Sequence, residues 1–315
     1  MSTIDMRSFV GRYAVVLALL AMIVVFSLLR PDTFATRENF ESILVTESVL
    51  VMIALGVTVA LAAGEFDLSV AAVVGFAAGL LAHLTSDLGW ALAPALGLTF
   101  LACSLVGVAN GIFVVGFGVN SFITTLGTGT VVGGLALAIF GAETIGGVSS
   151  DLTDVVRSEV AGIGISALGA LVLAGALWYL LEHTPSGRYL FFTGAGREAA
   201  RLAGVRVNRV RFVALIASAA FAWMAGVVLA GQTGAAQATF GQPFLLPAFA
   251  AGFLGATTIK PGRYNAWGTV IGVYLLAVGT TGLQLLGAAD WVDDVFNGSA
   301  LVLAVTLSRL VSREE

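Results

Sequence analysis

Three groups of polar residues interrupt the long apolar runs of this chain, and any chemistry of the chain would lie there. The first is residues 64–69, Gly-Glu-Phe-Asp-Leu-Ser, which place two carboxylates between apolar stretches. An aspartate at the centre of a membrane helix costs on the order of 2.5–3.5 kcal/mol, and ionisable groups at such places usually face a cavity or mark a pathway. Glu65, Asp67 and Ser69 are therefore candidates for a solute pathway or its gate. The alternative is a simple turn, in which Gly64 ends one helix and Asp67 or Ser69 caps the next.

The second group is a run of amide and hydroxyl side chains beside glycines, residues 120–129. A neutral, hydroxyl-rich solute could exchange hydrogen bonds with such groups as it passes, because hydroxyls both donate and accept. In the alternative interpretation, these hydroxyls bond back to carbonyls of their own helix. The candidate pathway residues in this run are Asn120, Phe122, Thr125 and Thr128. Five further amides have the same two interpretations: Asn110, Gln232, Gln237, Gln242 and Gln284.

The third group is a cluster of six arginines between residues 184 and 212, out of 15 lysines and arginines in the whole chain. Glycines bracket a short helix-forming stretch here, with Glu198 near its positive end and Gly204 as its stop. A short helix of this kind, rich in small residues, is suited to sit in a groove of a soluble protein and transmit its movement. If the arginines only anchored to anionic lipid headgroups, the charge would be explained but not the Gly–Ala pattern. The candidate coupling residues are Gly194, Arg197, Glu198, Ala199, Ala200, Arg201 and Gly204.

Motifs for bound cofactors or covalent chemistry are missing from the sequence. It contains no G-x-x-x-x-G-K-[ST] phosphate-binding loop, no Cys/His cluster with metal spacing, and neither G-x-S-x-G nor H-E-x-x-H. The single cysteine, Cys103, excludes an intramolecular disulfide. We therefore expect no enzymatic activity, no metal site and no cofactor of the chain's own.

Composition indicates a polytopic membrane protein. The chain is 58% hydrophobic and 11% charged, whereas ordinary globular domains are about a quarter charged. Because a spanning helix needs about 20 apolar residues, we expect an all-α protein with ten spans, or eight plus re-entrant pieces. The expected spans are 13–29, 43–63, 66–85, 90–116, 121–141, 161–182, 211–231, 244–259, 265–287 and 292–308.

The positive charges predict the orientation of these spans. Lysines and arginines in short loops mark the cytoplasmic side, and this arrangement places twelve of the 15 there when the N-terminus is inside. Both termini are then cytoplasmic. We expect one transmembrane domain over residues 1–315, with a cytoplasmic loop at 183–210; the resemblance described next implies that the membrane is the cytoplasmic (inner) membrane of a bacterium.

The three groups occur in an order that resembles the permease subunits of the ribose/xylose/galactoside class of bacterial ABC importers. That class carries a G-G-I-D-L-S-type motif, a P-F-I-A-T-L-G-T stretch, then T-x-x-G-R…A-x-G-x-N-x-x-A-A-x-x-x-G-I, and finally an A-A-x-x-x-G-G-T-S-type segment. The counterparts in this chain are residues 64–69, 121–128, 184–205 and 250–258.

The resemblance implies a function and partners. It implies a permease for a small neutral solute, most simply a monosaccharide or polyol, with a second permease copy or paralogue, an extracytoplasmic solute-binding protein and two cytoplasmic ATPase subunits. ATP would be bound by those ATPases, and the region from Arg197 to Gly204 would contact them. No nucleic-acid partner is expected.

Several residues depart from the pattern of that class. Glu65 and Phe66 replace Gly and Ile, and Arg197 replaces the usual Asn. In the late motif, Ala256 stands where a second Gly is expected, while Leu245 and Pro247 replace acidic residues. These changes leave the transporter class intact and the identity of the solute open.

Two other classes of transporter stay as alternatives. An ion-coupled secondary transporter usually needs ionisable or ion-coordinating groups at mid-membrane, and Glu47 is the clearest acidic residue within an expected span. An ABC permease for another solute, such as a nucleoside or a branched-chain amino acid, would keep the architecture. The N-F-A-H-G-E-like segment typical of the branched-chain amino acid permeases does not occur.

Overall fold

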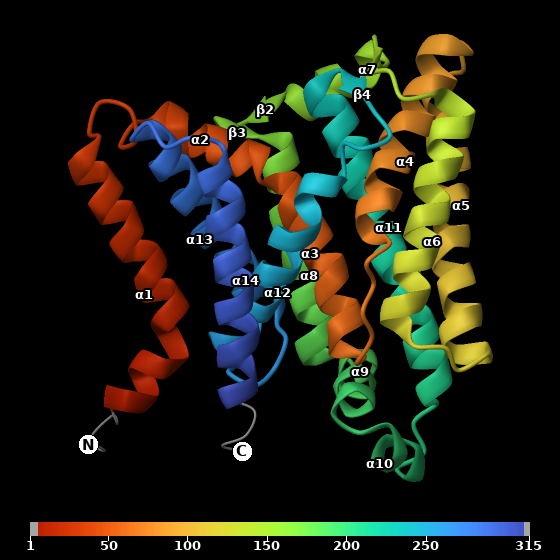
Figure 1. Ribbon diagram of the computed structural model, residues 1–315, viewed down its shortest axis with the longest axis vertical. Helices are drawn as coiled ribbons and strands as arrows, with labels where there is room; N and C mark the ends of the chain where they lie inside the picture. The colour runs from red at the N-terminus through yellow and green to blue at the C-terminus, as the bar shows by residue number, and fades with distance from the viewer. Residues whose placement is uncertain (1–5, 312–315) are drawn as a thin grey trace.

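The computed structural model describes residues 6–311, and side chains from 12 to 307. This part of the chain is a bundle of helices with four two-residue strands at one end (Figure 1). The helices are α1 (Met6–Leu29), α2 (Arg37–Thr46), α3 (Ser48–Ala62), α4 (Val70–Ala82), η1 (His83–Asp87), α5 (Leu92–Gly111), η2 (Ile112–Gly116), α6 (Ser121–Phe140), α7 (Ser150–Arg157), α8 (Ile165–His183), α9 (Pro185–Ala195), α10 (Arg197–Leu202), α11 (Val207–Thr233), η3 (Gln242–Phe244), α12 (Leu245–Thr257), α13 (Ala266–Leu285) and α14 (Trp291–Val311). The strands form two antiparallel pairs, β1 (Ile145–Gly146) with β4 (Ala235–Ala236) and β2 (Glu159–Val160) with β3 (Ile163–Gly164).

The described helices confirm a polytopic all-α membrane protein. Seven of them are long and apolar enough to cross a membrane, and α2 with α3, bent by 41°, makes an eighth if the pair is one span. The predicted count of ten is not reproduced. The predicted span 244–259 corresponds to α12, whose 13 residues reach only about 20 Å of the roughly 30 Å hydrocarbon core. The predicted span 292–308 corresponds to α14, whose first turn carries Asp293 and Asp294.

The chain is broken between α3 and α4, as one of the sequence alternatives expected. After α3 ends beside α9, residues 64–69 run back into the bundle without helical structure, and α4 begins partway along it (Figure 1). We call residues 64–69 the α3–α4 segment. A second irregular stretch, 234–244, precedes α12 and packs on α4: a Cβ added at Gly75 would lie 2.2 Å from the carbonyl oxygen of Ala238. Irregular backbone at membrane depth is tolerated where protein buries it.

Helix α11 packs against α3, α4 and α5 and forms the centre of this bundle. Small residues permit the close contacts, because helix association in lipid depends on packing rather than on exclusion of water. Gly226 of α11 is the clearest case, since an added Cβ would lie 2.5 Å from the carbonyl oxygen of Val74.

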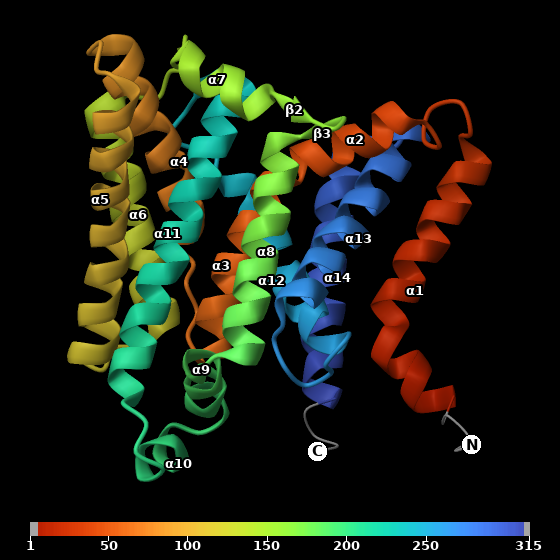
Figure 2. The ribbon, with the colours of Figure 1, turned by 180° about the vertical axis from the view of Figure 1, so that it is seen from behind.

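The two ends of the bundle carry different structures. Helices α9 and α10 lie at the same end as the start of α1 and the end of α14, while α2, α7 and the strands cover the opposite end (Figures 1 and 2). Helix α7 is amphipathic and buries Leu152 and Val156. Arg157, its last residue, donates from Nε to the carbonyl oxygen of Gln232 at 3.1 Å. The charge distribution predicts that the arginine-rich end faces the cytoplasm.

Candidate functional site

The α3–α4 segment is fastened to α5 and α6 by a buried polar network. Ser69 Oγ donates to Asp67 Oδ1 at 2.5 Å and accepts from Asn110 Nδ2 at 2.9 Å. Thr128 Oγ1 in turn donates to Asn110 Oδ1 at 2.6 Å. Asp67, Ser69 and Asn110 are completely buried. The structure therefore brings together three predicted pathway residues, with Asn110 as the link between them.

Hydroxyls of α6 bond to the free backbone groups of the same segment. Ser121 Oγ accepts from the Phe66 amide at 3.1 Å, and Thr125 Oγ1 accepts from the Leu68 amide at 3.0 Å. Thr125 Oγ1 also lies 3.2 Å from the Phe66 carbonyl and 2.8 Å from that of Ser121. These hydroxyls replace the bonds that a continuous helix would have made, which is how broken membrane helices are usually stabilised. Thr125 therefore contributes to the position of the segment, beyond bonding within its own helix.

The other two predicted pathway residues of the run 120–129 have separate roles. Asn120 caps α6, since its Oδ1 accepts from the amides of Phe122 at 2.9 Å and Ile123 at 3.3 Å. Phe122 contacts Phe66 edge-on with ring centroids 6.2 Å apart, and Phe66 stacks on Phe249 of α12 at the same separation. Phe66 and Phe122 are partly exposed. This aromatic cluster joins α6 to the α3–α4 segment and to α12.

We call residues 183–210, the predicted cytoplasmic loop, the basic loop. Glu65 pairs with Arg197 of this loop and with Arg211 of α11. Its side chain is 1% exposed, and its Oε1 accepts from Arg197 Nη2 at 2.8 Å and from Arg211 Nε. Arg197 Nη2 also donates to the Gly64 carbonyl at 3.2 Å. Glu65 and Arg197 each depart from the sequence pattern of the transporter class, and in the structure the two side chains form an ion pair with each other. Their separation of 132 residues hid the pairing from sequence reasoning.

Gly194, at the end of α9, makes a second contact with the same region. A Cβ added there would lie 2.3 Å from the carbonyl oxygen of Ala62, the last residue of α3, and 3.3 Å from the Gly64 amide. No larger residue fits without a backbone shift, because one side of the contact is main chain. Gly194 and Arg197 thus attach the basic loop directly to the α3–α4 segment.

Helix α10 has the predicted form. It runs from Arg197 to Leu202, and Gly204 follows in the left-handed conformation with φ of 81°. Arg201 Nη1 pairs with Glu198 Oε1 at 2.8 Å on its surface. Ala200 is buried against Val205 and Val207 and cannot contact a partner. The prediction of a docking role for Ala200 therefore conflicts with its position, since it holds α10 to the bundle instead.

The exposed face of α10 contains one residue that sequence reasoning missed. Leu202 is 90% exposed, the highest value among the large apolar side chains described, and it is the last residue of α10, which lies at the tip of the bundle (Figure 1). Glu198, Ala199 and Arg201 of the same helix are exposed as well. The sequence did carry a signal for Leu202, because a large apolar residue stands there at the end of a short charged helix. Single exposed leucines are common on protein surfaces, and it is the place of Leu202 at the end of α10 that makes it a candidate contact.

The loop after α12 also contacts helices at the arginine-rich end of the bundle. Lys260 pairs with Glu182 at the end of α8, and the Arg263 guanidinium lies 3.7 Å from the ring centroid of Phe191 in α9. Arg12 donates from Nε to the Ile259 carbonyl at 2.7 Å and so joins α1 to this loop. The loop after α12 is thus connected to α1, α8 and α9.

Comparison with known proteins identifies the family. The model of the family described as branched-chain amino acid transport system / permease component matches residues 39–305. The D-allose transport system permease protein of Escherichia coli K12 is 30% identical over 97% of this chain and 94% of its own length. The ribose import permease protein of Bacillus subtilis 168 is 31% identical over 93% and 91%, and the galactose/methyl galactoside import permease protein of Salmonella typhimurium LT2 is 29% identical over 98% of both chains. No solved structure matches.

These matches cover nearly the whole chain and include the two broken segments and the basic loop. They agree with the resemblance found in the motifs and with the helices that suit a membrane. The chain therefore belongs to the branched-chain amino acid transport system / permease component family, and it is a non-enzymatic permease subunit of an ABC importer in the bacterial inner membrane.

Proposed function

We propose that this permease imports a neutral monosaccharide or a related polyol. Relatives at 28–31% identity carry names for D-allose, ribose, galactose/methyl galactoside and autoinducer 2 import. The family description names branched-chain amino acids, but the segment typical of those permeases is missing from this sequence. The similarity to individual relatives therefore favours a sugar.

The aromatic cluster of Phe66, Phe122 and Phe249 supports the same class of solute. Two of its rings are partly exposed and come from α6 and from the α3–α4 segment. Ligand sites are lined mainly by apolar and aromatic side chains with a few polar groups that fix orientation. A sugar ring offers apolar C–H faces for such rings and hydroxyls for nearby Thr and Ser.

The ATPase partner would bind the exposed face of α10. In this arrangement, Leu202 fills a pocket of the ATPase, and Glu198, Ala199 and Arg201 surround it, since interface energy concentrates in a few buried anchors. A solute-binding protein would dock at the opposite end, over α2 and α7. A second permease copy or paralogue would complete the pathway.

The single observation that carries this proposal is the contact between Arg197 and Glu65. Arg197 is the first residue of α10, and Glu65 lies in the α3–α4 segment. A displacement of α10 by the ATPase would therefore act on that segment through an ion pair and through the close contact at Gly194. Two packed elements with a shared polar contact are a physical route for such coupling.

The docking role can be tested with Leu202→Asp. Placing a carboxylate in the proposed apolar contact should abolish copurification with the cognate ATPase and reduce uptake of labelled sugar to background. The matched control is Arg188→Gln, which changes net charge by the same amount on the exposed surface of α9. If the Leu202 variant still assembles and transports, the ATPase binds elsewhere. If purified permease alone accumulates sugar without ATP, the whole proposal fails.

The sugar itself can be identified from the binding protein. A thermal-shift screen of the cognate binding protein against pentoses, hexoses, polyols, nucleosides and branched-chain amino acids should give its largest shift with a monosaccharide or a polyol. A largest shift with leucine or with a nucleoside would contradict the proposed substrate class while leaving the ABC mechanism intact.

A further inference from the structure

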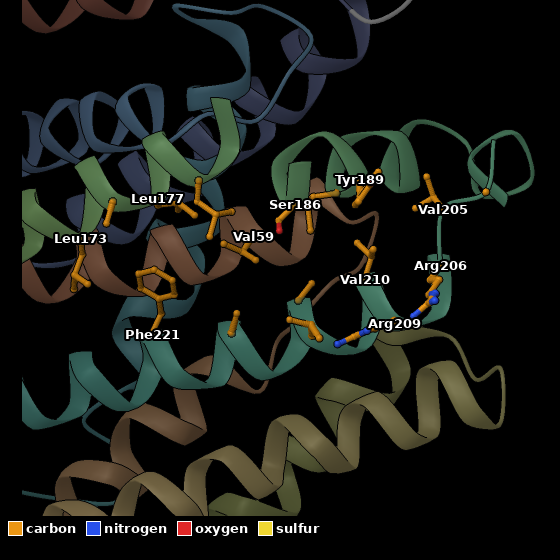
Figure 3. A pocket seen from close by; sticks show the side chains of 17 residues that line it. Val59, Leu173, Leu177, Ser186, Tyr189, Val205, Arg206, Arg209, Val210 and Phe221 are labelled. Atoms are coloured by element: carbon orange, nitrogen blue, oxygen red, sulfur yellow. The ribbon is translucent and has the colours of Figure 1, made fainter. Parts of the chain in front are cut away.

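A large apolar cavity lies outside the proposed pathway. It has a volume of about 790 Å³ and lies between α8 and α11, with α3 at its floor and α9 at its cytoplasmic end (Figures 2 and 3). This volume is within the range of roughly 300–1,000 Å³ that is typical of ligand sites. Its walls are mainly aliphatic and aromatic, and include Val59, Leu173, Leu177, Val213 and Phe221.

The cavity adjoins a basic hollow at its cytoplasmic end. This hollow has a volume of about 370 Å³, and it shares Val205, Arg206 and Arg209 with the apolar cavity. Arg206 and Arg209 are exposed, and neither takes part in an ion pair within the described part of the chain. Arg201, also on the hollow, is already paired with Glu198. The two volumes together form one amphipathic site.

The position of this site in the bundle decides what can reach it. Leu180 and Val213 on its walls are 42% and 53% exposed, and they belong to spans α8 and α11. The surface of such spans faces hydrocarbon. Arg206 and Arg209 flank the start of α11, at the arginine-rich end of the bundle. The cavity is therefore open to the cytoplasmic leaflet. A long apolar molecule with an anionic head could place its tail against the apolar walls and its head beside Arg206 and Arg209.

We propose that this cavity binds an anionic phospholipid of the cytoplasmic leaflet, with an acyl chain between α8 and α11 and the phosphate at Arg206 and Arg209. Basic pockets between transmembrane helices on this side are the usual place for anionic headgroups. The N-terminus of α11 adds to the attraction, because its free amides and the helix dipole favour an anion.

The bound lipid would have a structural consequence for the basic loop. Ser186 and Tyr189 of α9 line the cavity as well, and Gly204 and Val205 follow α10. Figure 3 shows these α9 side chains across the cavity from Phe221 and Val210. A lipid in the cavity therefore fills the space under α9 and α10 and supports the two helices against α8 and α11.

The charge requirement is tested by lipid titration of the purified permease, followed by native mass spectrometry and thermal unfolding. Phosphatidylglycerol should bind and raise Tm, and phosphatidylcholine should bind much more weakly. Arg206→Gln and Arg209→Gln should each weaken phosphatidylglycerol binding about fivefold, and the double variant about thirtyfold. Arg188→Gln is the control, because Arg188 is an exposed arginine of α9 outside both hollows.

The apolar half needs its own pair of variants. Ala176→Phe should fill the cavity and displace the lipid, whereas Val172→Phe, on an exposed face of α8 outside the cavity, should not. Phosphatidylglycerol with a photoreactive acyl chain should crosslink to peptides of α8 and α11, and Ala176→Phe should abolish these crosslinks.

Three outcomes would overturn the proposal. The first is equal binding of phosphatidylcholine and phosphatidylglycerol. The second is a full Tm shift with inorganic phosphate alone that Ala176→Phe leaves unchanged, since that describes a free-anion site. The third is a lipid-free protein dimer that Ala176→Phe dissociates, since a second copy would then occupy the cavity.

Discussion

Glu65 is the residue on which the proposed coupling would depend most directly, because its carboxylate has almost no contact with water and two arginines as partners. The two arginines differ in environment: the Arg197 side chain is 45% exposed, and that of Arg211 only 11%. Removing one partner of a buried ion pair is strongly destabilising, while exposed pairs contribute little. The three side chains should therefore respond differently to neutralisation.

We predict that Arg197→Gln lowers sugar uptake at least tenfold while unfolding shifts by only a few degrees. Glu65→Gln should lower both uptake and Tm, because it leaves Arg211 buried without a counterion. Uptake in proteoliposomes with the ATPase, together with thermal unfolding, separates the two effects. Unchanged uptake in Arg197→Gln, at the level of the Arg188→Gln control, would show that α10 acts on the pathway by another route.

Much at the residue scale was visible in the sequence, but partners were not. Glu65, Asp67, Ser69, Thr125, Thr128, Gly194 and Arg197 were all chosen from polarity and spacing, and the structure brings most of them together around one segment. Polarity and spacing could not predict where each side chain points or which residue it contacts. Asn120 became a cap, Ala200 turned inward, and Arg197 reached a glutamate that no periodicity could assign to it.

At the scale of elements, the α3–α4 segment replaces helical hydrogen bonds with bonds from α6. Sequence reasoning placed a span at 66–85 because most of the run is apolar, and hydropathy does not distinguish a helix from an extended stretch inside the protein. The same limitation applied to 244–259, which is a short helix after an irregular stretch. The glycines and the acidic residues did indicate a break between α3 and α4.

We predict that Thr125→Val destabilises the protein by about 1–2 kcal/mol, because it leaves the buried amide of Leu68 without a partner. Thr130→Val is the matched control on the same helix, since the Thr130 hydroxyl bonds only to the carbonyl of Leu126 and is exposed. Thermal unfolding in detergent measures both variants. Equal stability of the two would mean that the segment does not need the α6 hydroxyl.

At the scale of the whole molecule, the bundle has one end that would receive force and one that would receive solute. Helices α9 and α10 contact the α3–α4 segment through Glu65 and Gly194, and the loop after α12 through Arg263. The α3–α4 segment and the loop after α12 thus both contact α9. A movement of α9 and α10 would therefore act on the segment and on that loop at once.

This arrangement has meaning only if α10 faces the compartment that holds ATP, and the chain allows a direct test of that orientation. Cys103 is completely buried in α5, so an impermeant maleimide should leave the unmodified protein unlabelled. In a Cys103→Ala background, Leu202→Cys should react only in inverted vesicles, because the charge distribution places α10 inside. Val155→Cys on α7, 57% exposed at the opposite end, should react only in intact spheroplasts. The reverse pattern would place α10 outside, out of reach of any ATPase, and would exclude the coupling through Arg197 and Glu65 together with the docking role of Leu202.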